Sequence, residues 1–458
     1  MAKTERPEPL AVSLLLTLER LVYGQSPDAP GAAWCPDTHA TASTGDVDLV
    51  LNMTDAPSTE RTLRPVYASA LTEDAAIAEL LAGRIPSIGF LDSNESAPRI
   101  FHAAVERPRV LCKALDNLGA RLETIFIKAV ADIAAGRPLA GQFGSLTTPP
   151  AIGLTAAITA RAKTALTSLA SKPPHWFVGW RVTHNDRVTD TLQLPARSWT
   201  RLADDGARFF ADPFLFEKDG RTWLFLEEYQ YAVGKALLSV VELGADGPIG
   251  TPRPIVERPY HLSYPFVFER EGQIWMLPEM SAAGRVELLR ATNFPFDWEP
   301  AGTLIEGHEI ADATIVEHGD RLWLFASVGG AGSSSWDNLH LWSAPSLTGD
   351  WRPHARNPVL IDAASARPAG AMFRRDGQLW RPAQDCTGGY GSALTLARVT
   401  TLDDEQFEQK NVASLRPNAV WPGIGLHTLN AAGAFEVVDG ASQGRRGWRP
   451  SPNLPVRE

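Results

Sequence analysis

The stretch ADPFLFEKDGRTWLFLEE, residues 211–228, decides the fold of the second half of this chain because it recurs. It aligns without gaps with SYPFVFEREGQIWMLPEM at 263–280. Two further copies follow, ADATIVEHGDRLWLFAS at 311–327 and AGAMFRRDGQLWRPAQD at 369–385, and a degenerate fifth, IGLHTLNAAGAFEVVDG, lies at 424–440. Repetition of this kind indicates an architecture built from similar units.

The period and the pattern of the repeat predict the blades of a propeller. Each copy contains an apolar strand, a Gly-containing turn and a second strand that opens with an aromatic residue. The aromatic markers lie 52, 48, 57 and 55 residues apart: Trp223, Trp275, Trp323, Trp380 and Phe435. Because intervals of about 40–50 residues with four strands each are typical of propeller blades, we predict a mainly β fold with a five-bladed β-propeller over 175–445.

An extra strand upstream of the first copy bears on whether the repeats close into a ring. Trp176–Val182 (WFVGWRV) has the composition of a strand and precedes the first repeat. We expect it to complete the last blade. An open β-solenoid is the alternative, and such a solenoid would not need this strand.

The front of the chain differs from the repeats, since it alternates strand and helix patterns. We predict a small α/β module over 1–136, a helical connector over 137–174 that includes an Ala-rich helix at about 153–170, and a C-terminal tail over 446–458. The module is predicted from four segments: strand Asp46–Thr54, a helix from Thr72 to Gly83, strand Arg84–Asp92, and a long helix over Arg109–Gly136.

Composition excludes several classes of function. The net charge of -10 argues against nucleic acid as a partner, because phosphate neutralisation needs clustered Lys and Arg. The three cysteines, Cys35, Cys112 and Cys386, have no metal-ligand spacing, so we expect no metal site and reduced thiols in the cytoplasm. The chain has no Walker loop and no GxGxxG that opens a helix, and we expect no cofactor. No segment is long and apolar enough to predict a transmembrane span.

Equivalent positions of the repeats should converge on the axial channel of a propeller. Eleven residues before each aromatic marker the chain has Asp212, Tyr264, Asp312, Ala369 and Ile424. Four residues after it the chain has Glu227, Glu279, Ser327, Gln384 and Asp439. Ionised acids are rarely buried unless they are paired or functional, so these positions predict a channel lined with carboxylates.

Three of these acids are candidate catalytic residues, because glycoside cleavage uses two carboxyl groups that flank one bond. Asp212 is the candidate base or nucleophile, Glu279 is the candidate acid, and Asp312 occupies the same position as Asp212 in the third blade. The structural alternatives are an Asx turn for each aspartate and a salt bridge at the rim for Glu279.

Other polar residues of the repeats are candidates for binding the substrate. Arg side chains suit bidentate contacts with carboxylates, phosphates or sugar hydroxyls, although ion pairs between blades are an equally good interpretation. The candidate substrate-binding residues are Glu228, Tyr264, Arg367, Arg381, Asp385 and His427.

Several motifs resemble known propeller families. ADPFLF with the later IADATI, and LWSAPSLTGDWRPHARNPVL at 341–360, are similar to five-bladed furanosidases of the arabinanase, xylosidase and invertase groups. ADPFLF, LPE, SARPAG, RPAQD, YGSAL and GLHTLN together resemble the N-terminal propeller domain of plant glucosamine inositolphosphorylceramide transferases and its stand-alone bacterial relatives. This resemblance covers roughly 176–440. The front module resembles a degenerate formyltransferase-like fold through DVDLVLNMT and the helix after Phe101.

The resemblance implies two functions, which stay open at this point. By the furanosidase analogy Asp212 is the general base and Asp312 tunes the pKa of the acid. The Glu-Gly-Pro segment that carries the acid in that family is missing, so Glu279 or Asp385 replaces it or hydrolysis is absent. The chain is then either a glycoside hydrolase acting on a furanose, glycan or glycolipid headgroup, or a glycan-binding propeller that assists a separate glycosyltransferase.

Overall fold

A computed structural model describes the scattered residues Val12, Leu15–Thr17 and Glu19 and the ranges 49–53, 58–147, 174–195, 199–330, 332–417 and 423–442. The chain divides into two compact units. Unit 1 comprises Met1–Thr167 and Gly330–Ser334, and unit 2 comprises Ser168–Gly329 and Ser335–Glu458. The boundaries that the sequence suggests at 136, 174 and 445 stay a prediction.

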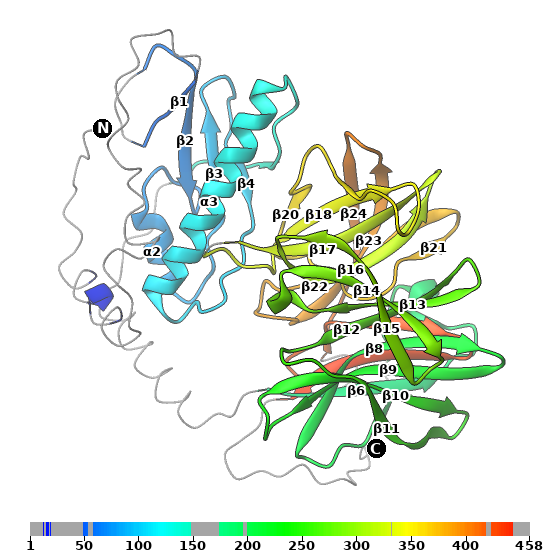
Figure 1. Cartoon of the computed structure of the whole chain (residues 1–458). Coiled ribbons are helices and arrows are strands. Elements are labelled where there is room, and N and C mark those ends of the chain that lie inside the picture. The colour runs from blue at the N-terminus through cyan, green and yellow to red at the C-terminus, as the bar shows by residue number, and fades with distance from the viewer. Residues whose placement is uncertain are drawn as a thin grey trace. The chain divides into compact units, whose positions relative to one another are not determined.

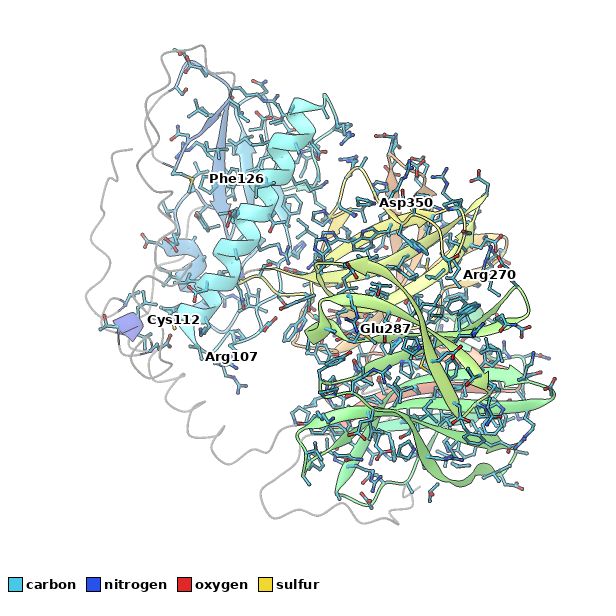
Figure 2. All side chains as sticks on the ribbon, in the orientation of Figure 1. Arg107, Cys112, Phe126, Arg270, Glu287 and Asp350 are labelled. Atoms are coloured by element: carbon cyan, nitrogen blue, oxygen red, sulfur yellow. The ribbon has the colours of Figure 1, made fainter. Side chains whose placement is uncertain are left out.

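Over its described residues from 49 to 147, unit 1 contains a five-stranded sheet and the helices α2 and α3 (Figure 1). The strands follow chain order, with β1 and β2 parallel and the others antiparallel: β1 Val50–Leu51, β2 Thr62–Tyr67, β3 Ile88–Asp92, β4 Arg99–Phe101 and β5 Gln142–Phe143. Helix α2 covers Asp74–Leu81 and helix α3 covers Leu111–Ala134. Phe126 of α3, labelled in Figure 2, packs against Phe90 of β3 with ring centroids 6.2 Å apart.

Two details of unit 1 differ from the sequence-based expectations. Helix α2 has Glu73 at its N-cap, because the first helical bond runs from the Ile77 N–H to the Glu73 carbonyl, one residue beyond the expected Thr72. Strand β3 begins at Ile88 instead of Arg84, after Pro86, which lacks an N–H for the ladder. The predicted helix at 153–170 lies outside the described residues, and the formyltransferase-like likeness of the module stays a prediction.

Unit 2 is a five-bladed β-propeller, as the sequence predicts. Each blade is an antiparallel sheet whose strands follow one another along the chain, apart from the last (Figure 1). Blade 1 is β8 Arg208–Lys218, β9 Arg221–Gln230, β10 Lys235–Gly244 and β11 Gly247–Val256. Blade 2 is β12 Ser263–Arg270, β13 Gln273–Glu279, β14 Arg285–Asn293 and β15 Asp297–Glu306. Short helices cover Val188–Thr191 (α5) and Ser281–Ala283 (η1).

The remaining blades follow the same plan. Blade 3 is β16 Glu309–His318, β17 Arg321–Gly329, β18 Asn338–Ala344 and β19 Arg352–Pro353, with β20 Leu360–Ile361 also paired to β18. Blade 4 is β21 Phe373–Arg375, β22 Gln378–Asp385, β23 Ala393–Leu402 and β24 Phe407–Leu415. Blade 5 is β25 Leu429–Ala432, β26 Phe435–Ser442, β6 His175–Val182 and β7 Thr200–Arg201.

Blade 5 closes the ring, because it takes strands from both ends of the propeller. Strand β6 pairs antiparallel with β26 over its whole length, from Phe435 opposite Val182 to Ser442 opposite His175. The expected closing strand Trp176–Val182 is therefore confirmed. Apolar clusters then join successive blades around the ring: blades 5 and 1 share one cluster, blades 1 to 3 a second, blades 3 and 4 a third, and blades 4 and 5 a fourth.

The hairpin that opens each repeat positions the inner strands. In three blades the two turn residues both have positive φ, as the tight type I′ turn requires: Asp219-Gly220, Glu271-Gly272 and Asp376-Gly377. These are the Asp-Gly and Glu-Gly pairs that the sequence repeats. A two-residue turn fixes the register of its hairpin, so the residues before and after it fall at equivalent places in each blade.

Candidate functional site

The inner strands of blades 1, 2 and 3 are interrupted at the same place. Their register shifts between Ala211 and Phe214, between Ser263 and Phe266, and between Ala311 and Thr314. Within each bulge one residue has a left-handed backbone: Asp212 (φ 45°), Tyr264 (φ 46°) and Asp312 (φ 56°). Such a conformation is costly for residues other than glycine, and together with bulges it is concentrated at functional sites.

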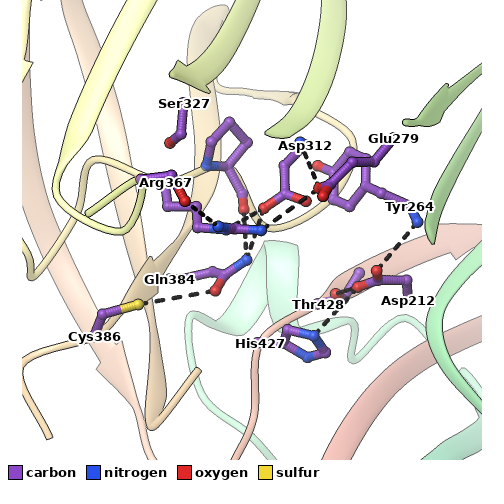
Figure 3. Close-up of polar contacts among 12 residues, drawn as sticks. Asp212, Tyr264, Glu279, Asp312, Ser327, Arg367, Gln384, Cys386, His427 and Thr428 are labelled. Carbon is purple, nitrogen blue, oxygen red and sulfur yellow. Dashed lines mark hydrogen bonds and ion pairs between the residues drawn. The ribbon is translucent and has the colours of Figure 1, made fainter. Parts of the chain in front are cut away.

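Asp212 is fixed by neighbours from blades 2 and 5. Its Oδ2 accepts a hydrogen bond from the Tyr264 N–H at 3.1 Å, and its Oδ1 accepts one from the Thr428 hydroxyl at 2.8 Å (Figure 3). The Nε2 of His427 lies 3.4 Å from the same Oδ1. Burial, opposed by the charge of His427 and reinforced by Glu227, raises the pKa of Asp212 to about 7.

His427 lies between two carboxylates. Its Nδ1 is 2.5 Å from Asp439 Oδ2, while its Nε2 faces Asp212. Asp439 also accepts hydrogen bonds from the backbone N–H groups of His427 and Thr428, each at 2.9 Å, and from that of Asp212 at 3.1 Å. Burial lowers the pKa of His427, but the charges of Asp439 and Asp212 outweigh it and raise this pKa to about 9.

Asp312 forms a second polar group with Arg367, Gln384 and Glu279. Its Oδ2 accepts hydrogen bonds from Arg367 Nε at 2.6 Å and from Gln384 Nε2 at 2.9 Å (Figure 3). Its backbone N–H donates to Glu279 Oε2 at 3.1 Å, and Arg367 Nη2 lies 3.5 Å from that same oxygen. Burial and the negative charge of Glu279 raise the pKa of Asp312, whereas the positive charge of Arg367 lowers it. The first two effects are larger, and the pKa rises to about 8.

Tyr264 connects three blades from within the channel. Its hydroxyl lies 2.9 Å from Thr314 Oγ1 in blade 3 and accepts a hydrogen bond from the Gly370 N–H at 2.7 Å. The side chain is wholly buried, and burial raises its pKa well above 10. Both of these partners of the hydroxyl belong to the protein, and a contact between Tyr264 and a substrate stays a prediction.

Aromatic rings gather next to His427. The ring of Trp176 lies 4.1 Å from that of His427, and the ring of Tyr390 lies 5.3 Å from it. Trp336 contacts Tyr390 from the other side, at 5.4 Å, and the guanidinium of Arg367 lies 5.2 Å from the Tyr390 ring. Tyr390 is 36% exposed, so this cluster links the buried carboxylates to the surface of the propeller.

Two glycines make room for these rings. Gly391 has a φ of +55°, and a Cβ there would lie 2.6 Å from the Cβ of His427 and 3.1 Å from the Trp176 ring. A Cβ at Gly425 would lie 2.8 Å from that same ring. The glycines of YGSAL and GLHTLN are therefore required by the packing of the aromatic cluster.

The structure brings six of the nine predicted site residues into one network: Asp212, Tyr264, Glu279, Asp312, Arg367 and His427. The other three have their contacts elsewhere. Glu228 bonds Arg208 and Ser239, Arg381 donates to the carbonyls of Ser365 and Ala366, and Asp385 accepts from Thr387 and lies 3.5 Å from Arg416.

Several residues of the network were not selected from the sequence. Gln384 and Asp439 stand four residues after their aromatic markers, the position that Glu279 occupies in blade 2, so the repeat carried the signal for both. Thr428, Trp176, Trp336 and Tyr390 lie outside those positions, and nothing in the spacing distinguishes them from ordinary packing residues.

One cluster offers atoms for a metal ion. Among the residues that the structure describes, single ligand atoms of Asp212, His427 and Asp439 lie within 4.8 Å of one another. Both imidazole nitrogens of His427 already face carboxylates, so a cation would have to displace His427 from one of them. The expectation of a site without metal or cofactor stays a prediction.

Comparison with known proteins gives the chain its relatives. Residues 196–435 match the family model of the N-terminal domain of glucosamine inositolphosphorylceramide transferase 1. The transferase of that name from Arabidopsis thaliana is 32% identical over 248 residues, which is 51% of this chain and 32% of the relative. The one from Oryza sativa subsp. japonica is 31% identical over 248 residues, 51% of this chain and 33% of the relative. The chain thus spans about a third of the length of these relatives.

Solved structures that are similar include glycoside hydrolases. A family 117 glycoside hydrolase of the marine bacterium Zobellia galactanivorans has 14% identity and a TM-score of 0.39, covering 58% of this chain and 91% of its own. A β-xylosidase has 9% identity and a TM-score of 0.39, covering 53% and 94%. Because the family model matches more than half of the residues, the chain belongs to the family of glucosamine inositolphosphorylceramide transferase 1 N-terminal domains.

Proposed function

We propose that the propeller hydrolyses a glycosidic bond in a glycan or glycolipid headgroup, with Asp212 as general base or nucleophile and Glu279 as general acid. The observation that supports this proposal best is the convergence of Asp212, Glu279 and Asp312, from three blades, on one network. Glycoside cleavage needs a pair of carboxyl groups with different roles at one bond.

Asp212 has the properties of a base that works near neutral pH. A general base is most effective when its pKa lies near the working pH, and burial raises the pKa of Asp212 to about 7. His427 and the Thr428 hydroxyl orient its Oδ1, and the Tyr264 N–H orients its Oδ2. This fixed geometry lowers the cost of positioning the carboxylate against water or a sugar carbon.

Glu279 is the carboxyl group best placed to meet a substrate oxygen. Its side chain is 12% exposed, compared with 5% for Asp212 and 3% for Asp312. Asp312 is held by Arg367 and Gln384, so its role is to hold Arg367 beside Glu279. The rings of Trp176 and Tyr390 then offer apolar faces to a neutral sugar.

The test compares wild type with Asp212→Asn, Glu279→Gln and the control Glu217→Gln on aryl glycosides of arabinofuranose, xylose, galactose, glucosamine and N-acetylglucosamine. Glu217 is an exposed carboxylate on β8, the strand that also carries Asp212. We expect release of sugar by wild type and by the control, and a loss of at least about 100-fold in kcat for the other two. Equal turnover by wild type and Asp212→Asn would remove Asp212 from the mechanism.

One observation favours a second function, recognition of a glycan on behalf of a separate glycosyltransferase. Arg367 is buried and contacts both Asp312 and Glu279, which leaves these acids in ion pairs instead of free for proton transfer. The named relatives are transferases, and this chain matches only about a third of them. Glycan binding by both wild type and Asp212→Asn, with turnover by neither, would favour this function.

A further inference from the structure

A second group of aromatic rings, centred on blade 1 and joined by His175 of blade 5 and by His261, lies outside the network described above. Phe209 and Tyr229 stack across the β8–β9 ladder with centroids 4.8 Å apart and planes 7° apart. Tyr231 contacts both, at 5.9 and 5.8 Å. His175 lies 6.2 Å from Tyr231, and His261 lies 6.1 Å from Tyr229. We call these five residues the blade 1 platform.

The platform is partly open to solvent and belongs to none of the apolar clusters between blades. Tyr231 is 45% exposed and the side chain of His261 is 43% exposed, while the other three residues are half-buried. Contiguous exposed rings are uncommon on a protein surface and mark places where a ligand or partner binds. Ring faces pack well against apolar C–H groups.

The platform is continuous with the candidate site through Glu227. This residue follows Trp223 by four positions, as Glu279 follows Trp275, and it is buried. Its Oε1 lies 3.3 Å from Nε2 of His261, and its charge is among those that raise the pKa of Asp212. Glu227 therefore connects the platform, through His261, to the carboxylate network around Asp212.

The charges around the platform select its ligand. Asp204 bonds His175 at its edge, Glu227 contacts His261, and Glu228 carries the ion pair with Arg208. Each of these three acids is paired with a basic side chain, so the group offers a phosphate or a carboxylate no unpaired cation, whereas carboxylate oxygens accept hydrogen bonds from hydroxyl groups. The platform therefore fits a neutral sugar ring, with C–H groups against the rings and hydroxyls toward the acids.

We propose that the blade 1 platform binds the second sugar residue of a glycan whose terminal residue lies at Asp212. The inference rests on the proposed function for the position of the terminal residue. It adds that the protein recognises a glycan of at least two sugar residues. It also adds that this glycan leaves the channel over blade 1.

The experiment measures binding by calorimetry for a series of neutral gluco-, galacto- and arabino-configured oligosaccharides of one to four residues. Wild type is compared with Tyr229→Ala and Tyr231→Ala, and with Phe143→Ala as the control for loss of an exposed aromatic residue in unit 1. We expect affinity to rise from one to two residues in wild type and in the control. The ratio of disaccharide to monosaccharide affinity falls by about tenfold in both tyrosine variants. Thermal unfolding of each variant shows that it is folded.

The outcomes separate this inference from the proposed function. A lower ratio of disaccharide to monosaccharide affinity in Tyr231→Ala than in wild type supports the platform even if no sugar is released. In that case only the proposal of hydrolysis fails. Equal ratios overturn the platform whether or not Asp212→Asn abolishes turnover. Failure of wild type to bind any of these oligosaccharides also overturns it.

Discussion

A carboxyl group as buried as Asp212 keeps its proton to a higher pH than one in water, because burial disfavours the charged form. The nearby cation of His427 acts in the opposite direction, since it stabilises the ionised carboxylate. His427 in turn keeps its charge because Asp439 is in contact with its other nitrogen. The protonation of the candidate base therefore depends on two residues of blade 5, more than 200 positions away in the chain.

Replacing His427 by glutamine should raise the pKa of Asp212 above its value of about 7, by about one unit, because the stabilising cation is lost. The measurement is the pH at which kcat/KM rises to half its maximum, together with the titration of the Asp212 carboxyl carbon by NMR. The exposed His308 provides the control, as His308→Gln. An unchanged titration of Asp212 in His427→Gln would show that burial alone sets this pKa.

At the level of secondary structure, the loop that precedes β21 packs so closely against the channel that one of its residues has no room for a side chain. Gly370 in this loop has a φ of +127°, and a Cβ there would lie 2.2 Å from the Leu429 carbonyl oxygen. Its N–H also donates to the Tyr264 hydroxyl. The glycine of SARPAG therefore allows blade 4 to meet blades 2 and 5.

Gly370→Ala should destabilise the propeller by more than about 2 kcal/mol, because strain from the positive φ adds to a backbone clash. Gly377→Ala is the matched control in the same blade: its φ is +74° but its Cβ would meet nothing within 4 Å, so it should cost only about 1 kcal/mol. Urea unfolding followed by tryptophan fluorescence measures both. Equal losses would mean that the loop relaxes away from Leu429.

The repeat predicted the strands of each blade and the positions that line the axial channel. Hairpins of equal length place equivalent residues of each blade at the same distance from the axis. This is why Asp212, Asp312 and Glu279 could be selected from spacing alone. Spacing does not give the direction of a side chain at a bulge, which depends here on the left-handed φ of Asp212 and Asp312, a conformation that is uncommon for residues other than glycine. An ion pair between blades was one of the two interpretations of Arg367, and the structure shows one with Asp312, but the choice of Asp312 as its partner could not be predicted for the same reason.

At the scale of the whole molecule, the buried groups of the channel should make stability depend on pH. A group whose pKa is higher in the folded than in the unfolded state binds its proton more tightly when folded, so stability falls as the pH rises between the two values. Asp212 rises from 3.8 to about 7, Asp312 from 3.8 to about 8 and His427 from 6.5 to about 9. All three act in the same direction.

The midpoint of thermal unfolding should therefore decrease from pH 5 to pH 9, and Asp212→Asn and Asp312→Asn should each flatten this dependence. Acids whose pKa is lowered, such as Glu79 and Asp92, give their full contribution above their ordinary values near 4 and do not offset the decrease. Tryptophan fluorescence reports mainly the propeller, because 13 of the 14 tryptophans belong to unit 2 and Trp34 belongs to unit 1. A midpoint of thermal unfolding that stays constant from pH 5 to pH 9 in wild type would contradict the raised pKa values of these three groups.

Every helix among the described residues is too short or too polar to cross a membrane.

The way in which the ring closes affects the order in which the parts of the propeller can form during synthesis. A ribosome releases β6 long before β26, so β6 leaves the ribosome without the strand that it pairs with in the finished ring. Blades 1 to 4 can form from consecutive strands as they appear, but Asp212 lacks His427 and Asp439 until the chain has been extended past residue 439. A nascent chain therefore lacks the finished surroundings of Asp212 until residue 439 has been added.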